Sequence, residues 1–150
     1  MTTTTGTTLD RQDVVLLIAA GAEGNYPLDP IRLMKGCFLV SQRGKAAWRS
    51  LFDFRPYDYG PFDSDVYRSR DALVSRGMLE VRRQGRYGSY MLTDAGREKV
   101  ASLRNQIGEQ SSDWFAQIGR YVTSRSFNDL LDEVYAAFPD FATRSVYSRS

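Results

Sequence analysis

The sequence predicts a mainly helical α+β fold with one small β-hairpin, on three observations. Apolar residues recur at helical spacing along most of the chain. Capping residues stand directly before several of these stretches. A basic segment over residues 79–92 alternates like two short strands around a glycine-bearing turn. The chain has 150 residues, of which 42% are hydrophobic, so it can bury a sizeable core.

The first part of the chain predicts a tail, three helices and a strand. Residues 1–8, mostly threonine, predict a flexible tail. The first helix is expected over 10–20, with one apolar face formed by Val14, Leu17 and Ile18. A second helix begins at Asp29-Pro30, where the aspartate caps the helix and the proline takes the first helical position, and it runs to about residue 43. Residues 45–51 predict a short helix, and residues 52–55 predict a short strand that Pro56 ends.

The middle of the chain predicts a capped helix followed by the hairpin. The helix covers residues 64–76, is capped by Asp63 or Ser64, and ends at Gly77, where a positive φ is needed. Strands over 78–83 and 88–92 follow, and Thr93 caps a helix that runs through residue 107. This order of helices, glycine, basic strand, turn, strand and Leu-Thr-x-x-Gly is typical of a winged helix-turn-helix. We expect that domain over residues 9–104, with the hairpin as its wing.

The rest of the chain, residues 105–150, predicts an additional C-terminal helical extension. Its helices are expected over 112–124 and 127–138, where Pro139 ends the second. The extension carries more aromatic residues than a winged helix needs to close its own core. We expect part of this surface to pack on the first helix and part to form a homodimer.

Composition excludes several classes of protein. No apolar run approaches the roughly 18 residues of a membrane span, and no basic leader precedes residues 14–20. The single Cys37 lies in an apolar run, which predicts a buried, inert thiol in a reducing cytoplasm. The chain has no histidine, and so lacks the commonest general base and zinc ligand. We therefore predict a cytoplasmic protein without catalytic residues, metal or cofactor.

The charge is unevenly distributed. Residues 31–104 carry fifteen Lys and Arg against eight Asp and Glu, a net +7, whereas residues 1–30 carry −3 and residues 105–150 carry −2. A basic middle between acidic flanks favours a polyanion such as double-stranded DNA. The alternative is an ordinary solvated surface.

The candidate DNA-binding residues lie on the hairpin and on the helix before it. Arginines around a hairpin tip can neutralise phosphates or enter a narrow minor groove. On helix 64–76, Arg68 with Ser64 or Ser75 could read bases, whereas Asp63, Asp65 and Asp71 would repel phosphate. That acidity leaves open a protein partner for the same surface. The full candidate set is Arg82, Arg83, Arg86, Tyr87, Arg68, Ser64, Ser75 and Lys45. Helical projection turns Arg68, Asp71, Ala72 and Ser75 outward, and Val66, Leu73 and Gly77 inward.

Arg70, Tyr57 and Tyr59 are further candidates, for a structural or a ligand-binding role. Arg70 projects near the apolar line of its helix, so we expect it to pair with an acid such as Asp53 or Asp58, or to reach along the tyrosine loop. Gly60-Pro61 reverses the chain between the tyrosines and the next helix. A structural corner is the favoured interpretation of this turn, with a ligand site as the alternative.

Several of these segments together resemble a known group. They are Leu33-x-Lys35, the run 57–62 (Tyr-Asp-Tyr-Gly-Pro-Phe), Val66-Tyr67 and the run 75–79 (Ser-Arg-Gly-Met-Leu). Over residues 10–104 they look like small prokaryotic winged-helix proteins related to the Panacea-type antitoxins. The resemblance implies transcription regulation, toxin neutralisation or phage defence. The chain departs from the pattern at Arg70, where an apolar residue is usual, and in its longer tail.

Two functional hypotheses follow. The first is a dimeric DNA-binding regulator whose basic hairpin grips the phosphate backbone. The second is a protein-interaction module, an antitoxin or defence adaptor, that keeps the fold and binds a protein. An enzyme is a distant third.

Overall fold

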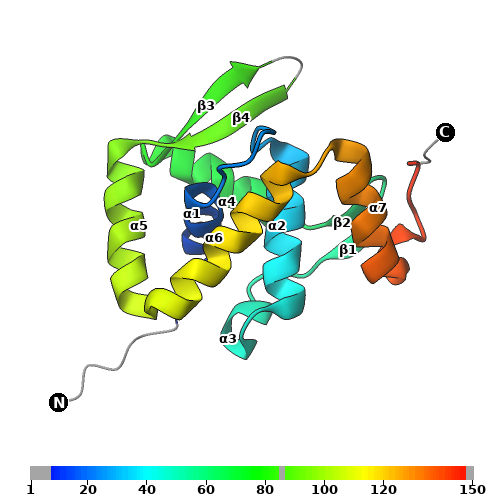
Figure 1. Cartoon of the computed structure of the whole chain (residues 1–150), viewed down its shortest axis with the longest axis horizontal. Helices are drawn as coiled ribbons and strands as arrows, with labels where there is room; N and C mark the ends of the chain where they lie inside the picture. The colour runs from blue at the N-terminus through cyan, green and yellow to red at the C-terminus, as the bar shows by residue number, and fades with distance from the viewer. Residues whose placement is uncertain (1–7, 85–86, 148–150) are drawn as a thin grey trace.

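The structure is a computed structural model that describes residues 8–84 and 87–147 (Figure 1). Most of the expected tail and the hairpin residue Arg86 lie outside the described residues, as do the side chains of Gln84 and Tyr87. The helices are α1 (Arg11–Ala20), α2 (Pro30–Arg43), α3 (Ala46–Arg49), α4 (Ser64–Ser75), α5 (Asp94–Ile107), α6 (Glu109–Ser124) and α7 (Phe127–Ala137), followed by the 3-10 turn η1 (Pro139–Ala142). The strands are β1 (Arg55–Tyr57), β2 (Gly60–Phe62), β3 (Leu79–Gln84) and β4 (Tyr87–Leu92). The predicted mainly helical α+β class is confirmed.

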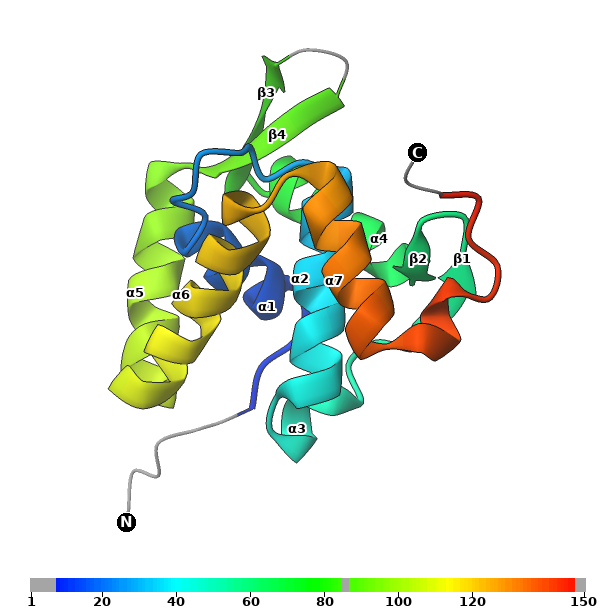
Figure 2. The ribbon, with the colours of Figure 1, turned by 45° about the vertical axis from the view of Figure 1, so that its right-hand side comes forward.

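Helix α1 is the centre of the core. It contacts α2, α4, α5, α6 and β4, and Figures 1 and 2 show it enclosed by these elements. All five residues from Val14 to Ile18 are buried. The expected single apolar face was therefore too narrow, because Val15 and Leu16 are covered as well. A helix that is apolar all round is stable only when it is surrounded.

Helix α6 crosses α1 at close range. A Cβ on Gly119 would lie 2.2 Å from the carbonyl oxygen of Ile18, so only glycine allows this approach. Phe115 and Val122 of α6 are fully buried in the same core cluster as α1. Helix α6 thus packs on the first helix, and the core draws on residues both before and after position 104.

The predicted caps form local hydrogen bonds. The side chain of Asp29 accepts from the N–H of Arg32 at 2.9 Å, and that of Thr93 from Gly96 at 3.1 Å. Helix α6 begins at Glu109, three residues earlier than predicted, because Gly108 with φ 87° turns the chain within a single residue. Within the described ranges, no helix is long and apolar enough to cross a bilayer.

The first hairpin corrects a sequence prediction. A strand was expected over 52–55 and a break at Pro56, but β1 begins at Arg55 and pairs with β2. Pro56 stands directly opposite Pro61 in this register. Two residues without N–H groups fit opposite each other where an antiparallel ladder makes no hydrogen bonds.

The second hairpin projects from the helical body (Figure 1). Its register pairs Leu79 with Leu92 and Arg83 with Gly88. The N–H of Tyr90 donates to the carbonyl of Leu28 at 2.9 Å, so the loop between α1 and α2 adds an edge contact to β4. Gly77, with φ 74°, connects α4 to β3 as predicted.

Candidate nucleic-acid interface

The exposed stripe of α4 consists of Ser64, Arg68, Asp71 and Ser75. These positions repeat at helical spacing, while Val66 and Leu73 are fully buried on the opposite side. The predicted orientation of the helix is confirmed with two exceptions: Gly77 is exposed, and Ala72 is half-buried. The structure therefore brings the predicted α4 candidates together on one outward surface.

The two described hairpin arginines lie on opposite faces of β3. Arg83 shares a face with Val81, which stands opposite Tyr90, because side chains alternate along a strand and paired residues share a face. Arg82 lies on the other face, where its Nε is 3.5 Å from the Glu80 carboxylate. Both arginines are exposed. The backbone of Tyr87 pairs with Gln84 in the ladder.

Arg70 fastens α4 to the hairpin. Its guanidinium donates to the Tyr90 hydroxyl and to the Asp71 carboxylate, each at 2.8 Å, and lies 4.5 Å from the centre of the Tyr67 ring. An acidic partner was predicted, but Asp53 and Asp58 were the wrong ones. Burial raises the pKa of the Tyr90 hydroxyl, so it remains protonated at neutral pH. Because Tyr90 faces α4, the hairpin face that carries Arg83 is turned to the α4 side.

The acids of α4 repel an anion less than the sequence suggests. Asp63 is buried, and its carboxylate accepts from the N–H groups of Asp53 and Asp65 at 2.6 and 2.9 Å. Asp65 pairs with Arg68 at 3.1 Å and with Arg11 at 3.5 Å. The carboxylates are thus directed to partners within the chain, and the outward charge of α4 is close to neutral.

Lys45 does not join this surface. It lies at the start of α3, at the opposite end of the molecule from the second hairpin in both Figure 1 and Figure 2. Its ammonium lies 5.5 Å from the centre of the Trp48 ring. The prediction that grouped Lys45 with the DNA-binding candidates is therefore not supported by its position, because the length of chain between Lys45 and the second hairpin does not determine how far apart they lie in the fold.

The tyrosine turn is clamped from two sides. Lys35 of α2, 2% exposed, donates from Nζ to the carbonyl of Tyr59. The Asp58 carbonyl accepts from the N–H of Val146 at 2.9 Å and from the hydroxyl of Ser145 at 3.1 Å. These bonds support the structural-corner interpretation.

Lys35 is the residue whose role sequence reasoning missed. Burial lowers the pKa of its ammonium to about 7, and among the described residues no carboxylate forms an ion pair with it. A lysine within an apolar helical run was the available signal. Tyr57 and Tyr59, the other candidate residues of this turn, are 49% and 44% exposed.

The remaining candidate chemistry is limited. Cys37 is fully buried, and burial raises the pKa of its thiol, so it stays protonated and inert, as predicted. The part of the chain that the structure describes holds no group of three or more Cys, Asp or Glu residues placed to bind a metal ion.

Comparisons with family models, curated proteins and solved structures found no match to this chain.

Proposed function

We propose that this chain is a winged helix-turn-helix protein that binds double-stranded DNA as a transcriptional regulator, without enzymatic activity. The observation that carries the proposal is the contact between Arg70 of α4 and Tyr90 of the second hairpin, which joins the helix that bears the exposed stripe to the hairpin face that carries Arg83. An exposed helix beside a cationic hairpin can occupy a DNA groove while the hairpin contacts the adjacent backbone.

The order of elements supports the fold assignment. Helix α1, an extended loop, helices α2 and α4 and then the hairpin follow one another, and the bond from Tyr90 to Leu28 joins the loop to the hairpin edge. The inserted α3, β1 and β2 make the connection between α2 and α4 longer than a simple helix-turn-helix turn.

Backbone contact is expected to dominate over base reading. Within α4, Arg68 and Arg70 are matched by Asp65 and Asp71, so the helix adds little net charge. The hairpin arginines, including Arg86, supply most of the net positive charge of the proposed interface. Binding should therefore depend strongly on salt and weakly on sequence.

Single hairpin variants test the geometry of this proposal. Arg83→Ala is expected to weaken binding to a 24-base-pair random duplex about five- to tenfold, the loss of one charge-assisted contact. Arg82→Ala should weaken it less, because Arg82 lies on the other face beside Glu80. Lys45→Ala is the control and should leave fluorescence anisotropy curves unchanged. Equal effects of all three substitutions would contradict the assignment.

A protein partner is the second candidate, and exposed apolar side chains favour it. Val74 and Val81 are 37% and 49% exposed on or beside the same surface, and phosphate contact gives them no role. Val81→Thr separates the two functions, since it should leave duplex binding unchanged but weaken an apolar protein contact. A failure of wild-type protein to bind duplex at low salt would favour the partner, as for an antitoxin or a defence adaptor.

A homodimer through the C-terminal helices completes the proposal. Two copies would present two hairpins to adjacent half-sites on DNA. Half-buried rings of α6 and α7, such as Trp114 and Tyr135, already pack against the core of their own chain. Sedimentation that finds only a 17.0 kDa particle would rule the dimer out.

A further inference from the structure

A groove lies between α2, α6 and α7, on a different face from α4. Figure 1 shows α6 in front of α2 and Figure 2 shows α7 in front of it, with α4 behind. The groove has a volume of about 650 Å³, and small-molecule sites typically span about 300 to 1,000 Å³. Its apolar lining includes Leu39, Trp114, Ile118, Val134, Ala137 and Phe138.

One positively charged side chain at this groove, Arg43, has no carboxylate partner among the described residues. Arg43, at the end of α2, stacks on the Phe138 ring with 5.3 Å between its guanidinium carbon and the ring centre. No ion pair of Arg43 occurs within the described residues. The acid of the lining, Glu133, accepts from the Tyr121 hydroxyl at 2.8 Å and pairs with Arg125 at 3.0 Å. Glu133 is therefore neutralised, and the charge of Arg43 is left for a ligand.

We propose that this groove binds an amphipathic organic anion, with its apolar body on the lining and its carboxylate or sulfonate on Arg43. A guanidinium presents a planar fork of donors that matches such an anionic group. Stacking on Phe138 holds that fork at the lip of an apolar surface, which reduces the cost of ordering it. The site involves neither the hairpin nor α4, so it does not depend on DNA binding.

The probe is 8-anilinonaphthalene-1-sulfonate, with neutral N-phenyl-1-naphthylamine as its matched counterpart. Fluorescence titration of the full chain should give saturable binding of the anion. Arg43→Gln should weaken the anion about tenfold while the neutral probe is unchanged. Ala137→Trp, which fills the groove, should remove both. Arg120→Gln is the control, because Arg120 lies on α6 outside this groove and pairs with Glu23.

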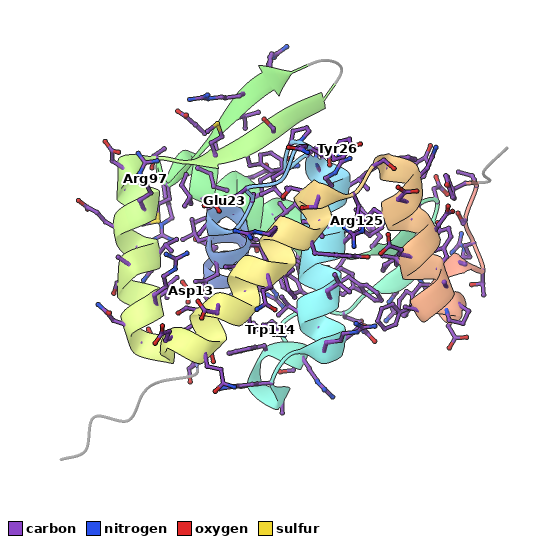
Figure 3. The ribbon with its side chains drawn as sticks, viewed as in Figure 1. Asp13, Glu23, Tyr26, Arg97, Trp114 and Arg125 are labelled. Atoms are coloured by element: carbon purple, nitrogen blue, oxygen red, sulfur yellow. The ribbon has the colours of Figure 1, made fainter. Side chains whose placement is uncertain are left out.

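Chemical-shift mapping of the wild-type chain makes the test independent of variant folding. The anion should shift the amides of Gln117, Ile118 and Ala137, which line the groove together with Trp114. Trp114 is labelled in Figure 3. The inference is overturned if the shifts cluster elsewhere, if no saturable binding occurs, or if Arg43→Gln binds the anion as tightly as the wild-type chain.

Discussion

Replacing buried Lys35 with methionine should stabilise the fold below neutral pH. The ammonium is 2% exposed, and its pKa falls from 10.5 to about 7 on folding. At about 1.4 kcal/mol per pKa unit, burying the charged form costs about 5 kcal/mol. Lys35→Met removes that cost but leaves the Tyr59 carbonyl without its donor, a loss of about 1 to 3 kcal/mol. The net expected gain at pH 6 is about 2 to 4 kcal/mol.

The same group predicts the pH dependence of the wild-type chain. The unfolded chain keeps the Lys35 proton up to about pH 10.5, whereas the folded chain releases it near pH 7. Between these values the unfolded state binds more protons, so the free energy of unfolding rises with pH, by about 2 kcal/mol from pH 7 to 8.5. The predicted rise is limited to pH 8.5 because, at higher pH, the raised pKa of the buried Cys37 thiol lowers the free energy of unfolding as pH increases.

Urea unfolding followed by circular dichroism at pH 6, 7 and 8.5 measures both effects. The chain has no histidine, so no imidazole titrates in this range. Lys45→Met is the control: Lys45 is exposed, and its loss should leave the pH slope intact. A wild-type stability that is flat with pH, or a slope that persists in Lys35→Met, would refute the reasoning.

The remaining predictions concern packing. Gly60→Ala should lower the free energy of unfolding by about 2 to 3 kcal/mol, because its φ is 94° and a Cβ would lie 2.8 Å from the Tyr135 ring. Gly77→Ala, at φ 74° in open space, should cost only about 1 kcal/mol; equal losses in thermal melts would contradict this. Phe115→Ala should cost about 3 to 5 kcal/mol, because the ring is fully buried 4.8 Å from that of Trp48. A loss under 1 kcal/mol would show that the site is loosely packed.

Features set by neighbouring residues could be predicted from the sequence. The caps at Asp29 and Thr93 and the glycine turn at Gly77 depend on backbone geometry within a few positions, and each lies where the pattern indicated. The outward stripe of α4 follows from helical periodicity for the same reason.

Features set by residues distant in sequence could not be predicted. Besides the adjacent Asp71, Arg70 bonds the Tyr90 hydroxyl, twenty residues away on the second hairpin, and no local spacing encodes that contact. The all-round burial of α1 depends on α6, whose close crossing at Gly119 is visible only in three dimensions. Lys45 was predicted to join the DNA-binding residues, although α3 lies at the opposite end of the molecule from the second hairpin (Figure 1).

The salt dependence of binding to random duplex DNA tests the central proposal most directly. If Arg82, Arg83 and Arg86 contact phosphates, the plot of log affinity against log salt should be steep, with a slope of about 0.9 for each phosphate neutralised. The triple alanine variant should lose measurable binding while keeping the wild-type melting temperature. A wild-type chain that does not bind at low salt, or a triple variant that binds with an unchanged slope, would contradict the proposed DNA interface.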